Sequence, residues 1–300
     1  MSWLDTTLEK LASNPVCGYR PGGAPASEPT ALAVMALAAA HAKSAERAEP
    51  GRAFLAKLQS GDGSVGIRER EVSPGWPTSL AVLAWLTASS TVNQVPAANP
   101  YQTNLDKATD WILSAKGTTI ARSPEMGHDP TIVAWSWAEN THSWVEPTAL
   151  HVLGLKAVGK STHHRTRDGV AMLIDRQLAS GGWNYGNTTI LGQTLRSHVQ
   201  PSGVALLAVA DEKDASGRIA KSIAYVKEAL RPDTTPASLA WGLLGLAAHG
   251  ETIPQAEKWL EKSYQWTLAH DQSPAKQALL ALAAIPDGWK KLARTIGTPS

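Results

Sequence analysis

One stretch decides the predicted fold of this chain: Arg176–Gln177–Leu178–Ala179–Ser180–Gly181–Gly182–Trp183–Asn184–Tyr185–Gly186–Asn187. It continues an amphipathic segment, residues 170–178, and its glycine pair interrupts the helical pattern. Glycine readily adopts the left-handed conformation that closes the last turn of a helix. We expect Gln177 to hydrogen-bond a free backbone group at the end of a neighbouring helix, and Trp183 to cover the junction.

A weaker copy lies upstream, where Gln59 and Gly63 are followed by Val65 in place of the tryptophan. Both stretches resemble the QxxxGxW repeat of terpenoid cyclases of the squalene and oxidosqualene type, whose fold is shared with the β-subunits of protein prenyltransferases. The residues that match the motif in full are Gln177, Gly181 and Trp183. The resemblance implies an α/α toroid.

A repeat supports this prediction independently. Six segments, rich in Ala and Leu and nearly free of charge, begin at Pro29, Pro77, Pro147, Pro201, Pro236 and Pro274. Proline is favoured at the first position of a helix, and a helix that is apolar on every side is buried on every side. Charged amphipathic helices are predicted over Trp3–Ala12, Arg52–Gln59, Leu105–Lys116, Asp168–Leu178, Arg218–Leu230, Gln255–Trp266 and Gly288–Ile296.

Buried and half-exposed helices therefore alternate about six times along the chain. An inner ring of helices wrapped by an outer ring satisfies this pattern, so we predict an all-α fold, a single α/α toroid over residues 1–300. An open superhelical solenoid is the structural alternative. A closed toroid would leave a central cavity. Residues 91–146 form an irregular insertion, and we expect its aromatic and titratable side chains to form the mouth or lid of that cavity.

Composition restricts the function. The 300 residues carry 28 Lys and Arg against 26 Asp and Glu, a formal charge of +2 without a long basic run, so no nucleic-acid partner is expected. The single Cys17 excludes an internal disulfide framework. No secretion signal is recognisable, and the longest apolar run, residues 31–40, is too short for a transmembrane segment. We expect a cytoplasmic protein.

Candidate site residues cluster near one predicted end of the inner helices. We expect catalytic roles for Glu146, His142 and His198. The aromatic side chains expected to shape a cavity for a hydrophobic isoprenoid or lipid-like molecule are Trp76, Trp135, Trp144, Trp183 and Tyr185. Indole faces stabilise cations by roughly 0.5–2 kcal/mol each. The structural alternative is that the tryptophans pack the repeat junctions.

Glu28 and Glu146 each precede a proline, so we expect both to be non-helical residues at the N-cap. The helix dipole should then lower the pKa of each carboxyl group. An acid that starts a cyclisation must instead keep its proton, which requires desolvation or a neighbouring carboxylate. We therefore expect these glutamates to act as a base, a cation stabiliser or a ligand, or simply to cap their helices.

The chain departs from the family where chemistry is concerned. Protonation-initiated cyclases carry a DxDD-type motif, and prenyltransferase β-subunits carry a zinc-binding Asp, Cys and His. Neither pattern is present in this sequence. A DDxxD motif is also absent. Three functions remain open. The first is a non-standard terpene cyclase or isomerase, and the second is a non-catalytic toroid that binds a lipid or a protein partner. The third is an enzyme with a divalent metal at a rim formed by His128, His142, Glu146, His198 and His270.

Overall fold

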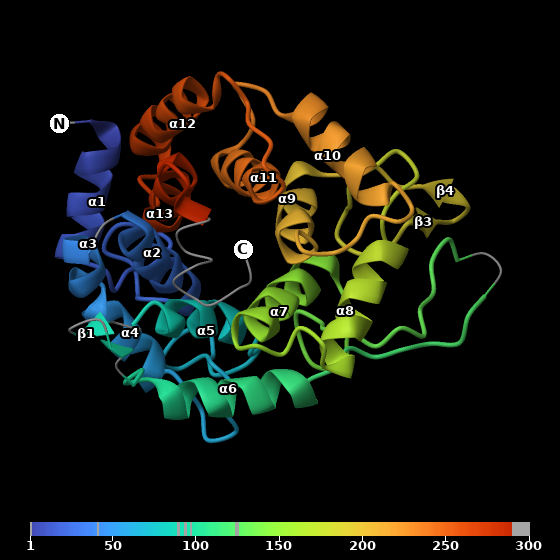
Figure 1. Cartoon of the computed structure of the whole chain (residues 1–300), viewed down its shortest axis with the longest axis horizontal. Coiled ribbons are helices and arrows are strands. Elements are labelled where there is room, and N and C mark those ends of the chain that lie inside the picture. Colours follow the sequence, from blue (N-terminus) through green and yellow to red (C-terminus); the bar gives the residue numbers. More distant parts are fainter. Residues whose placement is uncertain are drawn as a thin grey trace.

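The computed structural model describes residues 2–40, 42–88, 91–92, 95–96, 98–123 and 126–289. In this part of the chain, helices form two concentric rings (Figure 1). The inner ring consists of α2 (Ser27–Ala40), α5 (Thr78–Leu86), α7 (Val145–Ala157), α9 (Val199–Ala208), α11 (Pro236–Ala248) and α13 (Pro274–Ala284). The outer ring consists of α1 (Trp3–Ser13), α4 (Glu49–Lys57), α6 (Gln102–Ser114), α8 (His164–Asp175), α10 (Arg218–Ala229) and α12 (Ala256–His270).

The remaining elements are short. Helix α3 (Ala42–Arg47) lies between α2 and α4 in the chain. Strand β1 (Thr91–Val92) pairs antiparallel with β2 (Val95–Pro96), and β3 (Thr189–Ile190) pairs in the same way with β4 (Gln193–Thr194). Among the described helices, none is both long and apolar enough to cross a lipid bilayer.

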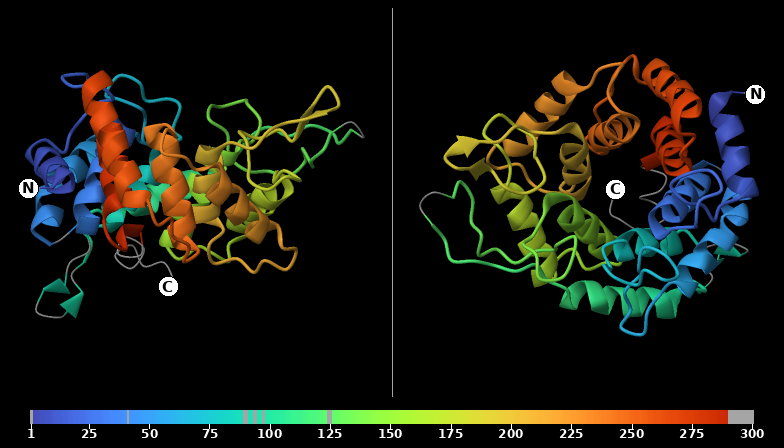
Figure 2. Two further views of the ribbon diagram at one scale, coloured as in Figure 1. Left: turned by 90° about the horizontal axis from the view of Figure 1, so that it is seen from above. Right: turned by 180° about the vertical axis from the view of Figure 1, so that it is seen from behind.

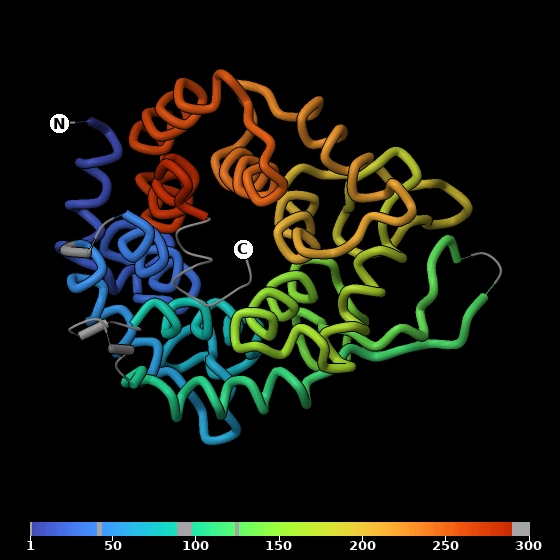
Figure 3. The backbone as a smooth tube through the Cα atoms, in the orientation of Figure 1, coloured from blue at the N-terminus to red at the C-terminus, as the bar shows by residue number. Residues whose placement is uncertain are grey.

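The ring is closed. Each inner helix packs against the next along the chain, and α13 packs against both α2 and α1. The chain thus runs once around the ring and returns to its start (Figure 3). This confirms the predicted α/α toroid and excludes the open solenoid for the described residues.

Sequence patterns explain which helices are inside. Every residue of α7 is buried, because this helix has neighbours in both rings. In α10, by contrast, the buried Ile219, Ser222 and Val226 recur at helical spacing on one face. The predicted helix Gly288–Ile296 falls largely outside the described residues, which end at residue 289.

The prolines begin the inner helices less uniformly than predicted. Pro236 and Pro274 are the first residues of α11 and α13, as expected, but Pro29, Pro147 and Pro201 are each the third residue of their helix. The first backbone N–H groups of a helix have no partner within it, so proline fits anywhere in the first turn. The helices α2, α7 and α9 therefore begin two residues earlier than the sequence suggested.

The hydroxyl residue after the proline has a repeated role. Its side-chain oxygen accepts a hydrogen bond from a backbone N–H in the loop that leads into the inner helix. The pairs are Thr30 with Cys17 (3.2 Å), Thr78 with Val65 (2.8 Å), Thr148 with Trp135 (3.2 Å) and Ser202 with Trp183 (2.8 Å). Alanine takes this place after Pro236 and Pro274. Four of the six repeats thus fasten their loops by the same contact.

The glutamine–glycine–tryptophan stretch forms the predicted junction. Gln177 Nε2 donates to the backbone oxygen of Arg218 and to Ser222 Oγ, both in the first turns of α10. Gly181 and Gly182 have φ of +89° and +73°, and the indole N–H of Trp183 donates to Leu173 O at 2.6 Å. The weaker copy is similar, because Gln59 Nε2 donates to Asn104 O at 3.0 Å. The predicted role of the motif in joining neighbouring helices is confirmed.

The predicted insertion, residues 91–146, contains the outer helix α6 and a long irregular segment, residues 115–144. Its outer part extends away from the ring, beside the β3–β4 hairpin (Figures 1 and 2). This outer part does not lie over the central opening, so the expectation of a lid is wrong for it. Its returning part lies against the ring, where the backbone N–H of Trp144 donates to Trp135 O just before α7 begins.

Candidate functional site

Three polar side chains occupy the same position in three repeats. Glu28, Glu146 and Gln200 are each the second residue of an inner helix, directly before its proline, in α2, α7 and α9. Because they occupy equivalent positions in the repeat, these three residues lie at the same end of the ring, where the inner helices begin. The sequence pattern predicted this grouping.

Glu146 is a buried carboxyl group. The residue is 7% exposed. Its Oε1 atom accepts a hydrogen bond from Gln200 Nε2 at 2.9 Å. Burial raises the pKa of Glu146, because the charged form loses its hydration, and the charge of Glu28 raises it further. The hydrogen bond from Gln200 opposes both effects.

Glu28 is held by a tyrosine. The hydroxyl group of Tyr19 donates to Glu28 Oε2 at 2.6 Å, while burial raises the pKa of Glu28 and this hydrogen bond lowers it. The net direction is upward. The residue nevertheless keeps part of its surface accessible.

Glu28 and Glu146 belong to inner helices that are not neighbours in the ring. Helix α5 packs between α2 and α7. The charge of Glu28 nevertheless contributes to the raised pKa of Glu146. A like charge disfavours ionisation, so this effect adds to that of burial.

Two expectations for these glutamates were wrong. Both residues lie inside the first helical turn rather than at the N-cap, which in α7 is Trp144. The pKa of each is raised rather than lowered. Desolvation outweighs the helix dipole at both residues.

The histidines predicted to act with Glu146 lie elsewhere. His142 is exposed and lines a pocket of about 520 Å³ between the 115–144 segment and the β3–β4 hairpin. His198 is exposed and lines a smaller pocket of about 230 Å³ together with Tyr185. Trp144 forms part of both pockets, and Glu146 lines neither. The structure thus separates Glu146 from the two histidine-lined pockets.

The predicted aromatic cavity is only partly formed by the expected side chains. Trp183 is 0% exposed and Trp135 1%, and their indole N–H groups donate to Leu173 O at 2.6 Å and Ile112 O at 2.8 Å. Placing Trp183 in a cavity wall was therefore wrong. The structural alternative holds for both residues, because helix-end carbonyls require buried donors and indole rings supply them. Trp135 only borders a pocket of about 140 Å³.

Trp76 is half-buried and borders that same pocket, where its ring and that of Trp137 form a T-shaped pair with centroids 4.9 Å apart.

The metal ligands considered from the sequence do not converge. In the part of the chain that the structure describes, no three His, Cys, Asp or Glu side chains are grouped as a metal ion would require. His270 lies on α12, stacked on Trp266.

Sequence reasoning missed two partners. Tyr19 lies in a glycine- and proline-rich loop, and no local pattern relates it to Glu28. Arg176 directly precedes the motif glutamine, but nothing in the sequence indicates that its guanidinium group lines the 520 Å³ pocket. Both contacts depend on tertiary packing.

Comparison with solved structures identifies the fold as that of type II terpene cyclases. The chain superposes on the type II terpene cyclase MstE from Scytonema in complex with merosterolic acid A, its product, with a TM-score of 0.59 and 12% identity over 95% of this chain and 97% of that one. A second MstE structure is in complex with geranylgeranyl dihydroxybenzoate, its substrate. The TM-score is 0.57 and the sequence identity 11%, over 99% of this chain and 98% of that one.

The ent-copalyl diphosphate synthase from Streptomyces platensis is also similar, with a TM-score of 0.51 and 16% identity over 86% of this chain and 50% of that protein. No protein-family model matches the sequence, and no curated protein matches it. At these identities the likeness establishes the fold and leaves the chemistry to be argued from the residues.

Proposed function

We propose that this protein is an isoprenoid cyclase or isomerase that starts its reaction by protonating an alkene, with Glu146 as the proton donor. The observation that carries the proposal is the buried carboxyl group of Glu146, whose pKa is raised by burial and by the charge of the partly exposed Glu28. A proton donor for an alkene must keep its proton at neutral pH, and desolvation beside a second carboxylate meets that requirement. The pair would take the place of the DxDD aspartates that this sequence lacks.

In the proposed step the O–H bond of Glu146 breaks, and the π electrons of a terminal alkene form a C–H bond with the released proton. The resulting carbocation is attacked by the next alkene, which closes a ring. Loss of a proton to a base ends the reaction, so that substrate and product are isomers and no oxidant is consumed. The ionised Glu28, on the same side of the ring, would stabilise the positive charge.

The likeness to MstE supports the substrate class. That protein is a type II terpene cyclase whose substrate carries a geranylgeranyl group, and its toroid corresponds to nearly the whole of this chain. The apolar inner helices are also compatible with a hydrocarbon chain in the ring. A non-catalytic toroid that retains a lipid or a protein partner is the alternative, and the missing DxDD motif supports it.

The test is incubation with farnesyl diphosphate, geranylgeranyl diphosphate and squalene in D₂O, followed by mass spectrometry of the products. The proposal predicts an isomeric product that contains one deuterium at the protonated carbon. E146Q should lower turnover by roughly 10²–10⁴-fold, the usual contribution of a general acid. E139Q, on an exposed glutamate, is the control. Turnover by E146Q at an unchanged rate would contradict the role of Glu146, and retention of a lipid or a protein partner without turnover would support the non-catalytic alternative.

A further inference from the structure

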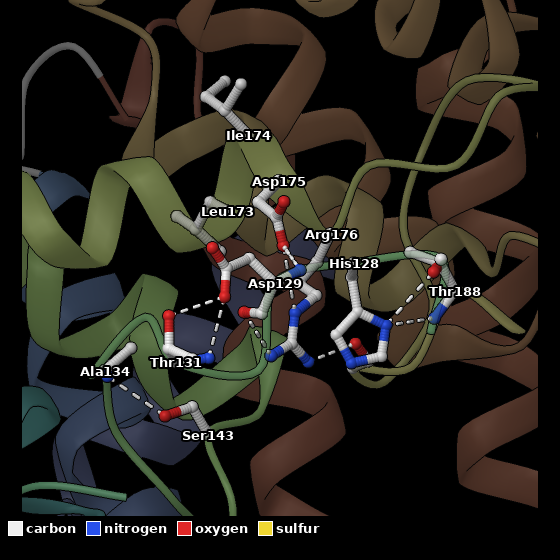
Figure 4. Close-up of polar contacts among 12 residues, drawn as sticks. His128, Asp129, Thr131, Ala134, Ser143, Leu173, Ile174, Asp175, Arg176 and Thr188 are labelled. Atoms are coloured by element: carbon white, nitrogen blue, oxygen red, sulfur yellow. Dashed lines mark hydrogen bonds and ion pairs between the residues drawn. The ribbon is translucent and has the colours of Figure 1, made fainter. Parts of the chain in front are cut away.

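The 520 Å³ pocket at the rim has a composition of its own. It lies between the 115–144 segment and the loop that follows α8, and the two are joined by a hydrogen bond from the backbone N–H of Gly127 to Thr189 Oγ1 at 3.1 Å. Its lining includes the apolar side chains of Ile120, Met126, Pro130 and Ile132. It also includes Arg176, His128 and His142. Figure 4 shows the side chains of Arg176 and His128 next to each other.

Arg176 is a buried cation with unused donors. The residue is 3% exposed, and its Nη1 and Nη2 groups donate to Gly186 O at 2.8 Å and to Asp129 O at 3.5 Å. Nε lies 3.4 Å from Asp175 Oδ2 but makes no hydrogen bond. A guanidinium group has five N–H bonds, so donors remain on both Nη atoms after these contacts.

The nearby carboxylates are already engaged in holding the loop. Asp175 Oδ2 accepts the backbone N–H of Asp129 at 2.9 Å, and Asp129 Oδ1 accepts two hydrogen bonds from Thr131, at 2.9 and 2.6 Å. Arg122 lies 3.9 Å from Asp129 Oδ2 and balances part of its charge. Asp175 therefore pairs with Arg176 through Nε, whereas the Nη atoms contact backbone oxygens.

The pKa of both histidines of this pocket is lowered. The backbone N–H of Thr188 donates to His128 Nδ1 at 3.4 Å, and Thr188 Oγ1 lies 3.2 Å from the same nitrogen. Burial and the charge of Arg176 lower the pKa of His128 and of His142. Asp175 and Asp129 act on His128 in the opposite direction. An anion between these groups would relieve the repulsion, and His128 and His142 would then take up protons more readily.

We propose that this pocket binds an oxyanion, either a carboxylate or a phosphate, carried on an apolar body. Arg176 supplies the charge-assisted hydrogen bonds, His142 and His128 contact the head group, and the apolar side chains receive the hydrocarbon part. A pocket of about 520 Å³ has room for more than the head group alone. The site is distinct from Glu28 and Glu146, which line no part of this pocket.

The test is isothermal titration calorimetry with three probes that share one tail, namely decyl phosphate, decanoate and decanol. A charge-assisted hydrogen bond predicts that an anionic probe binds about 10–100-fold more tightly than decanol. The order of decyl phosphate and decanoate identifies the preferred head group. R176Q should abolish this difference, and R196Q, on an exposed arginine at the neighbouring pocket, should leave it unchanged.

Because R176Q removes contacts that hold two loops, a second variant keeps the test independent of folding. H142E places a negative charge on an exposed side chain of the pocket and should weaken anion binding at least tenfold, whereas H270E, on exposed His270 of α12, should not. Equal binding of decanol and the anions, or equal effects of H142E and H270E, would overturn the proposal. E146Q should bind decyl phosphate as the unchanged protein does, so failure of the proposed catalytic step and failure of this site are distinguishable.

Discussion

At Glu146 two physical effects oppose each other. The start of α7 favours an ionised carboxyl group through the helix dipole, whereas burial favours the protonated one. Dipole effects amount to roughly 0.3–1 kcal/mol at exposed helix ends. Desolvation of a buried carboxyl group shifts its pKa by up to several units, each worth about 1.4 kcal/mol. The larger effect determines the outcome, and the pKa of Glu146 is raised.

The charge of Glu28 should affect the pH at which Glu146 loses its proton. Removing its charge with E28Q takes away one cause of the raised pKa of Glu146. If turnover requires protonated Glu146, activity falls as the pH rises through this pKa, and in E28Q the fall should occur at lower pH. Profiles of kcat against pH for the two proteins measure this shift. A shift to higher pH, or none, would show that Glu28 does not act on Glu146.

The same carboxyl groups should make stability depend on pH. Consider a group whose pKa is higher in the folded than in the unfolded chain. Its full contribution to the unfolding free energy is present at a pH below the pKa of the unfolded chain, and this contribution is lost as the pH rises through the pKa of the folded chain. The unfolding free energy should therefore decrease as the pH rises above the ordinary glutamate value of 4.5. In E146Q the decrease should be smaller, as urea denaturation at several pH values can measure. A steeper decrease in E146Q contradicts this sign.

At the scale of the element, substitutions at two glycines with similar φ test whether space is limiting at the junction. Gly182 and Gly159 have φ of +73° and +75°, but a Cβ at Gly182 would lie 2.4 Å from the Tyr225 ring, whereas one at Gly159 would meet nothing within 4 Å. Gly159→Ala should cost about 1 kcal/mol of conformational strain, and Gly182→Ala about 3 kcal/mol or more. Chemical denaturation measures both, and equal costs would mean that space at the junction is not limiting.

The repeated hydroxyl contact gives a second prediction at this scale. Thr78→Val keeps the shape of a fully buried side chain but leaves the backbone N–H of Val65 without its acceptor. The expected loss of unfolding free energy is about 1–3 kcal/mol. Thr6→Val, on the exposed side of α1, is the control and should cost less. If both variants lose the same stability, the contact does not fasten the loop.

The elements were predictable because their signals are local. Proline and a nearly uncharged run mark each inner helix, and a hydroxyl residue follows the proline in four of the six. The glutamine–glycine–tryptophan spacing marks a junction. The starts of α2 and α7 were misplaced because residues before proline seldom adopt helical angles, and only the fold shows that these do. The contact of Tyr19 with Glu28 joins segments that no sequence pattern relates.

For the whole molecule, the contact of α13 with α2 is what turns a row of repeats into a ring. Leu280→Ala removes a fully buried side chain of α13 and should cost about 2–5 kcal/mol. In a closed ring, the amides of α2 should lose hydrogen-exchange protection together with those of α13 and α11. Loss of protection confined to α11–α13 would instead describe repeats that open independently, as in a solenoid.

Closure also explains why the candidate acid could not be recognised in the sequence. Glu28 and Glu146 are far apart along the chain, and it is the ring that directs the first turns of α2 and α7 to the same interior end. The rim pocket depends on the fold in the same way, because the 115–144 segment and the β3–β4 hairpin meet only outside the ring. The sequence therefore indicates the kind of protein, whereas the arrangement of the polar groups requires the structure.

The central claim is that Glu146 carries a proton at neutral pH, and infrared difference spectroscopy measures this directly. The spectrum of the unchanged protein minus that of E146Q at pH 7 should contain a protonated carboxyl band, and the band should be weaker in E28Q, in which the pKa of Glu146 is lower. A difference spectrum with carboxylate bands and no protonated carboxyl band would contradict the account, because an ionised Glu146 cannot protonate an alkene.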